Sequence, residues 1–194
     1  MSKGCGCSRA SKKKKAQVAT TTVAEAKPKV FMPAMMVHQP LHIDGLKAVS
    51  FKSFQSELDS WLRSPYRHYS NNRKGVDCVN LVLQVLQGLK AIKPYKLNYY
   101  NKDWWTQQSE HPVFEKLFCD HPVVEIKKNY MPGDIMTFKF GKAERAHVGL
   151  YTIRDTIIHS VNGSGVIESS PNDKMWQKRI SGALRLAYSL EGVE

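Results

Sequence analysis

The stretch GVDCVNLVLQVL, residues 75–86, decides the fold, because it joins an acid and a thiol to a run that is apolar on nearly every side. Apolar and polar residues do not alternate after Cys78, which argues against a half-exposed strand and favours a central buried helix. Asp77 is a good N-cap, which puts Cys78 in the first turn. That turn carries unpaired N–H groups and the positive end of the helix dipole. We therefore expect the pKa of the Cys78 thiol to fall below the ~8.5 of a free cysteine.

This position of Cys78 has two interpretations. A buried helix would hold the sulfur rigidly at the floor of a cleft, where it could act as a nucleophile. Cysteine is also one of the most buried residue types, so the thiol could simply pack in the core. The stretch alone leaves both open.

Composition limits the remaining possibilities. The chain has 194 residues, room for one domain and a tail, and 42% of them are hydrophobic, enough for a core. No apolar run reaches the ~18 residues of a membrane span, and the N-terminus lacks the apolar region of a secretory signal. The four cysteines match no four-ligand zinc pattern, so we expect neither a metal nor a cofactor. Cys5 and Cys7 are interpreted as free thiols; binding of a metal or cluster, or a link to a partner, is the alternative.

Charge and composition divide the chain into three parts. Residues 1–29 hold eight Lys or Arg against one acid, a net +7 of the chain's +12, and are predicted to be a disordered tail. The tail either contacts nucleic acid or an acidic surface through counterion release, or only aids solubility. Residues 30–49 are apolar but interrupted by Pro33 and Pro40, which predicts an extended arm that docks on its own domain or on a partner. Residues 50–190 form the predicted compact domain.

The compact domain begins with a predicted helix. Apolar residues recur at helical spacing from Phe51 to Leu62, Ser50 can cap the helix, and Pro65 ends it. Three strands are predicted in the second half of the chain, at residues 131–140, 144–153 and 155–161.

Two histidines lie in the last two of these strands. If the loop between them is Ile153-Arg154-Asp155, His159 pairs opposite Gly149 and lies diagonal to His147 on the same face. The glycine then leaves space between the two imidazoles. A two-residue loop would separate them. Burial of the alternate residues favours the longer loop.

Cys78, His147 and His159 could form a thiol site in which one imidazole transfers the proton and the other orients the first imidazole. Two alternatives remain. The histidines could be half-buried strand residues with no chemical role. A zinc site of one cysteine and two histidines is also possible, although no fourth ligand is evident.

The order of these pieces resembles the NlpC family of papain-like cysteine peptidases, which cut cell-wall peptides. The similar segments run from about residue 62 to 162, in the order of the family. They are PYRHYSNNRKGVDC (65–78), PGDIMTF (132–138), AHVGLY (146–151) and IIHS (157–160). The closing segment, VIESSPNDKMWQKRISGALRL (166–186), resembles the ends of bacteriophage-encoded members.

The resemblance implies roles for single residues. Cys78 matches the nucleophile, His147 the base and His159 the orienting residue. Tyr66 matches the tyrosine that helps hold the oxyanion, and Asp77 matches the acid before the nucleophile, so both are predicted to lie at the oxyanion or substrate-binding site.

The sequence departs from the family pattern near the cleft. Val79-Asn80 and His68-Tyr69 replace the usual small residues at the border of the substrate cleft, so the departure concerns specificity rather than chemistry. A long insert, residues 95–122, carries Trp104 and Trp105, which either line a glycan-binding wall or pack on the core. A helix starting at Pro112 is predicted there, with Cys119 as a buried bystander.

The resemblance implies an α+β papain-like NlpC fold, in which the helix that carries the nucleophile packs on an antiparallel sheet of about five strands. It also implies hydrolysis of a peptide bond in the peptidoglycan stem through a thioester. We expect a component of a phage virion, in its tail, made in the host cytoplasm without a signal peptide. It would open the cell wall and contact other tail proteins through its arm. Two alternatives are an inactive structural virion module with the same fold, and a thiol amidase or acyltransferase acting on another substrate.

Overall fold

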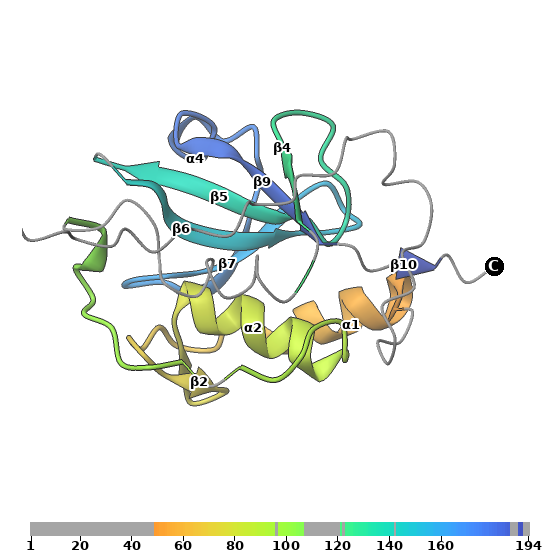
Figure 1. The fold of residues 1–194 in the computed structure, drawn as a ribbon, viewed down its shortest axis with the longest axis horizontal. Coiled ribbons are helices and arrows are strands. Elements are labelled where there is room, and N and C mark those ends of the chain that lie inside the picture. Colours follow the sequence, from red (N-terminus) through yellow and green to blue (C-terminus); the bar gives the residue numbers. More distant parts are fainter. Residues whose placement is uncertain are drawn as a thin grey trace, which may run out of the picture.

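A computed structural model describes residues 49–95, 97–106, 121, 123–141, 143–186 and 190–191. A six-stranded antiparallel sheet, in the order β4-β9-β5-β6-β7-β8, is the centre of the fold. Helices α1 and α2 lie on one face of the sheet and the short α4 lies on the other (Figure 1). The elements are β1 (Val49–Ser50), α1 (Phe51–Trp61), β2 (Asn71–Asn72), β3 (Gly75–Val76), α2 (Cys78–Gly88), the 3-10 helix η2 (Trp104–Thr106), β4 (Val123–Ile126), β5 (Ile135–Phe140), β6 (Ala143–Tyr151), β7 (Ile157–Val161), β8 (Gly165–Ser169), α4 (Lys174–Gln177), β9 (Ile180–Leu186) and β10 (Leu190–Glu191).

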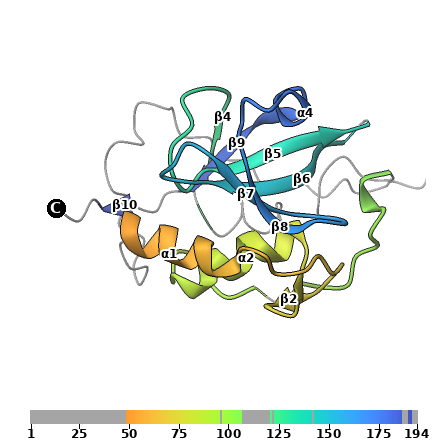
Figure 2. The ribbon, with the colours of Figure 1, turned by 180° about the vertical axis from the view of Figure 1, so that it is seen from behind.

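The two predicted helices that lie within the described residues form where the sequence indicates. Ser50 caps α1 by accepting a hydrogen bond from the Ser53 N–H, and Asp77 caps α2 by accepting one from the Asn80 N–H. Seven of the eleven residues of α2 are buried, because this helix packs between α1 and the sheet. Figure 2 shows the two helices side by side beneath the sheet, with the small β2–β3 hairpin near the end where α2 begins.

The β6–β7 hairpin has the predicted three-residue loop. Leu150 pairs with Ile158, and the Thr152 N–H donates to the Thr156 carbonyl, so the loop is residues 153–155. Asp155 takes a positive φ of 56°, the left-handed residue usual at the end of such loops. Val148, Leu150 and Ile158 face α2 in the core, as expected from the alternation.

The sheet has one strand more than the approximately five predicted. Its additional edge strand, β4, pairs with β9 and follows the long insert, where only the loop and helix were expected. The predicted helix from Pro112 lies outside the described residues. So do Cys5, Cys7, Cys119, the tail of residues 1–29 and the arm except Val49, which is buried in β1 and pairs with β10. Within the part of the chain that the structure describes, no helix is long and apolar enough to cross a membrane.

Candidate active site

Cys78 begins α2 at the floor of a cleft of about 500 Å³. The cleft opens between β6 and β7, which pair through Leu150 and Tyr151 and part toward His147. The cleft is lined by Tyr66, His68, Asp77, Cys78, Val79, Tyr100, Lys102, Asp103, Trp104, Phe140, Ala146, His147, Ser160, Val161, Asn162, Met175, Trp176 and Arg179.

The two histidines are in direct contact. His147 Nε2 lies 2.8 Å from His159 Nδ1, and His159 Nε2 lies 2.9 Å from Ser169 Oγ. Both imidazoles therefore lie on one face of the sheet, as the predicted register requires. His147 reaches the cleft, whereas His159 is fully buried behind it. The structure thus brings Cys78 and His147 to one cleft, with His159 against the far nitrogen of His147.

This chain of contacts is compatible with the tautomers that a thiol reaction needs. If His147 is to accept a proton on Nδ1, its Nε2 must carry a hydrogen and donate to His159 Nδ1. His159 then carries its own hydrogen on Nε2 and donates it to the Ser169 hydroxyl. Each nitrogen in the chain has a partner of the correct type, so the arrangement holds the His147 ring in place.

Aromatic rings enclose the histidine pair. The Trp176 ring stacks on His147 with centroids 5.7 Å apart, and the Phe138 ring stacks on His159 at 5.8 Å. Burial lowers the pKa of His147 well below 6.5, and the neighbouring His159 and Arg179 lower it further. Burial also lowers the pKa of His159 to about 4. Both imidazoles are therefore neutral at pH 7.

The expectation of an easily ionised thiol is wrong. Burial raises the pKa of Cys78 to about 12, and the negative charge of Asp77 raises it as well. The N–H groups of Val148, Val79 and Cys78 lie close enough to the sulfur to oppose this rise, but they do not outweigh it. The resting site therefore holds a neutral thiol and a neutral imidazole, and the proton must move when substrate binds.

The Asp77 carboxylate connects the segments around Cys78 through hydrogen bonds. Its buried carboxylate accepts hydrogen bonds from the Asn80 N–H and side-chain amide, the Tyr69 N–H and the Tyr100 hydroxyl. Tyr69 in turn donates to the Leu97 carbonyl. Two of the family departures, Tyr69 and Asn80, thus attach the insert to the start of α2. This network leaves Asp77 2% exposed, so its contacts fit a positioning role.

Tyr66 lies at the cleft, as predicted. Burial raises the pKa of its hydroxyl to about 12, and the nearby Cys78, Asp77 and Asp103 raise it further. The hydroxyl is therefore protonated at neutral pH and available as a hydrogen-bond donor. Trp104 lines the same cleft but is only 8% exposed, so most of its surface packs against protein.

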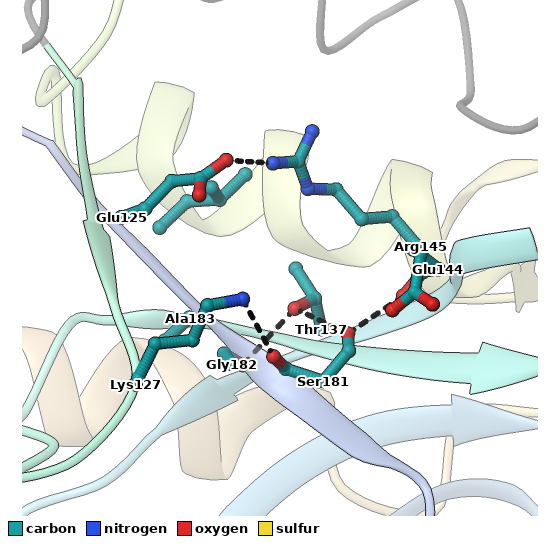
Figure 3. Close-up of a pocket in the computed structure, with 9 residues that line it drawn as sticks. Glu125, Lys127, Thr137, Glu144, Arg145, Ser181, Gly182 and Ala183 are labelled. Carbon is teal, nitrogen blue, oxygen red and sulfur yellow. Dashed lines mark hydrogen bonds and ion pairs between the residues drawn. The ribbon is translucent and has the colours of Figure 1, made fainter.

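A second hollow, of about 300 Å³, shares no lining residue with the cleft (Figure 3). Its polar groups bond to one another: Arg145 pairs with Glu125, and the Lys127 ammonium donates to the Ser181 carbonyl. Thr137 Oγ1 lies 2.9 Å from Ser181 Oγ. These groups lack a nucleophile with an adjacent base. Among the described residues, no three His, Cys, Asp or Glu side chains form a metal-ligand group, so the zinc interpretation has no support there.

Sequence reasoning missed three contributors to the site: Ser169, Trp176 and Arg179. Ser169 lies near the end of an edge strand, and nothing local marks it as a partner of His159. Trp176 and Arg179 belong to the closing segment, whose resemblance to phage-encoded members was the only signal that could have found them.

Comparisons with known proteins agree with this geometry. The pattern of the NlpC/P60 family matches residues 63–185, which include Cys78, His147 and His159. The probable endopeptidase NlpC of Escherichia coli K12 is 28% identical over 131 residues, 67% of this chain and 74% of that protein. The murein DD-endopeptidase MepS/murein LD-carboxypeptidase of the same strain is 26% identical over 142 residues, 73% of this chain and 66% of that protein.

A solved NlpC/P60 family protein from Bacillus cereus ATCC 10987 has a similar fold. Its TM-score is 0.51 at 17% identity, and the match covers 71% of this chain but only 40% of that longer one. This likeness supports the α+β fold.

Proposed function

Because this chain belongs to the NlpC/P60 family, we propose that it is a cysteine peptidase that hydrolyses a peptide bond in the peptidoglycan stem, with Cys78 as nucleophile and His147 as base. The hydrogen bond of 2.8 Å between His147 Nε2 and His159 Nδ1, next to a cleft floored by Cys78, is the observation that carries this proposal. The names of the two relatives, both endopeptidases, support the reaction class.

The first half of the reaction forms a thioester. His147 Nδ1 takes the Cys78 proton as the sulfur attacks the carbonyl carbon, so the neutral pair becomes charged only with substrate present. The Cys78 N–H and the Tyr66 hydroxyl are the donors proposed to hold the oxyanion. The carbon–nitrogen bond then breaks, and the imidazolium gives its proton to the leaving amine.

The second half releases the acid. His147 removes a proton from water as the oxygen attacks the thioester carbonyl, and the sulfur leaves and regains the proton. His159 keeps the His147 ring oriented throughout, and the Ser169 hydroxyl keeps the tautomer of His159. His159 and Ser169 are therefore positioning residues.

Digestion of purified peptidoglycan tests the reaction. New amino and carboxyl termini, identified by mass spectrometry, should appear with the wild-type chain and be absent with Cys78→Ala. Added EDTA should change nothing. Cleavage that survives Cys78→Ala, or that EDTA abolishes, refutes the assignment of the nucleophile, and the absence of new termini with the wild-type chain favours the inactive structural module.

We also propose that the chain acts in a phage virion, in its tail, where it opens the cell wall. The resemblance of the closing segment, residues 166–186, to the ends of phage-encoded members supports this. The basic tail, with its net +7, is proposed to contact other virion proteins or nucleic acid. An antibody against the chain should label purified virions; a chain found only in lysate, away from particles, refutes this location.

A further inference from the structure

Arg179 is a cationic side chain at the cleft without an acidic partner. Among the described residues, no carboxylate lies within ion-pair distance of its guanidinium. Four other arginines are paired: Arg73 with Glu57, Arg145 with Glu125, Arg154 with Asp59 and Glu168, and Arg185 with Asp134. Arg63 and Arg67 also have no ion pair among the described residues, but they lie outside the cleft. A guanidinium presents a planar set of donors that matches a carboxylate, so an unpaired one in a cleft can bind an acidic ligand.

The guanidinium of Arg179 is held in position. It lies over the Phe140 ring, 4.7 Å from the centroid, and Phe140 itself lines the cleft beside His147. The backbone is fixed as well, since the Arg179 N–H donates to the Trp176 carbonyl and the Lys139 N–H donates to the Arg179 carbonyl, both at 2.8 Å. Restricting the side chain in this way lowers the entropy lost when a ligand binds.

The charge of Arg179 also acts on His147. The titratable groups around His147 are His159 from β7, Cys78 from α2 and Arg179 from the turn after α4. The positive charge of Arg179 disfavours a second positive charge on His147, and so lowers the pKa of the imidazole. The reaction nevertheless requires an imidazolium, so the empty site opposes its own first step.

We propose that Arg179 binds a carboxylate of the substrate in the cleft, and that this bound negative charge allows His147 to take the thiol proton. This role of Arg179 rests on the proposed function, and it means that the site selects substrates that carry a carboxylate. The carboxylate of an acidic substrate would thus neutralise the charge of Arg179 as it binds. Both the turnover rate and the affinity would then depend on that carboxylate.

The test compares acidic and amidated substrates. A synthetic stem tetrapeptide and a series in which each free carboxylate is replaced in turn by its amide are given to the wild type, Arg179→Gln, Arg179→Lys and Lys178→Gln. Lys178 is the matched control, because it is the adjacent exposed cation and lies outside the cleft. For one of the carboxylates, the wild type should prefer the acid over the amide by about tenfold to a hundredfold in kcat/KM.

Arg179→Gln should remove this preference mainly by slowing cleavage of the acid. Cleavage of the acid should slow by about tenfold to a hundredfold, with part of the loss in kcat, while cleavage of the matching amide stays equal or becomes faster. Arg179→Lys should keep part of the preference, and Lys178→Gln all of it. Melting curves establish that each variant is folded.

Two outcomes overturn the inference. If Arg179→Gln slows acid and amide equally, the side chain has only a structural role. If it retains every wild-type preference, the carboxylate binds elsewhere. Wild-type protein that cleaves none of the peptides, and also leaves peptidoglycan intact, refutes the proposed function itself, whereas cleavage without any acid preference refutes this inference alone.

Discussion

Replacing Gly149 by alanine tests the geometry that joins the two histidines. A Cβ at position 149 would lie 2.8 Å from both His159 Cβ and Ile157 Cγ2, and 2.9 Å from the Ile158 carbonyl oxygen. Carbon atoms pack favourably at about 3.5–4.0 Å, so β7 must move away by roughly 1 Å. Ile157 and Ile158 are fully buried and cannot turn aside.

The size of the effect follows from these contacts. Overpacking a dense site costs about 1–3 kcal/mol, and losing the hydrogen bond between the histidines adds about 1 kcal/mol. We therefore expect a loss of roughly 2–4 kcal/mol in the free energy of unfolding, and a melting temperature lower by about 5–15 °C. Since the His147 ring loses its support, kcat should fall by about tenfold to a hundredfold with a smaller change in KM.

Urea unfolding and cleavage kinetics measure both effects. Gly88→Ala, at the end of α2, is the control: its Cβ would meet only the Glu57 side chain, with Oε1 at 3.6 Å and Cδ at 3.8 Å, which are ordinary contacts. That variant should gain up to about 1 kcal/mol, because alanine is the better helix former. If Gly149→Ala is as stable and as active as the wild type, the close approach of Gly149 and His159 is incorrect.

Four further predictions use other parts of the structure. In the cleavage assay, Cys78→Ala, Cys78→Ser and His147→Ala should abolish turnover while leaving the fold intact, whereas His159→Gln should keep partial activity and His159→Ala less; full activity of His159→Ala contradicts its role. The pKa of His159 falls from 6.5 to about 4 on folding, so the unfolded chain binds a proton there first as pH falls. The associated stability should be fully present above pH 6.5 and decline toward pH 4 by roughly 3 kcal/mol, and urea midpoints of His159→Gln should decline less over that window. Ser169→Ala should lower kcat several-fold and leave KM unchanged, because His159 Nε2 loses its hydrogen-bond partner and the imidazole is no longer held in one tautomer. An unchanged kcat means that the hydroxyl plays no part. Deleting residues 1–29 should leave the melting temperature nearly unchanged but weaken binding to nucleic acid or a virion protein, and a drop of many degrees would mean that the tail packs on the domain.

The sequence predicted those features that depend on neighbouring residues. The cap by Asp77 follows from one carboxylate at the start of an apolar run, and the structure has it. The three-residue loop before β7 follows from which residues must be buried, since a shift of one residue would turn His159 to the opposite face. Local pattern therefore sufficed to bring His147 and His159 together.

Chain packing decided the properties of the site that the sequence missed. The first turn of α2 should acidify a thiol, yet the pKa of Cys78 rises to about 12, because burial removes water from the sulfur and Asp77 lies beside it. Trp176, in α4, and Arg179, in the turn after it, lie about a hundred residues beyond Cys78 in the sequence, and only the packing of Trp176 against His147 of the sheet brings this segment to the cleft. The dielectric environment and net charge around a group are sums over everything packed near it, whereas a cap or a loop length depends on a few adjacent residues.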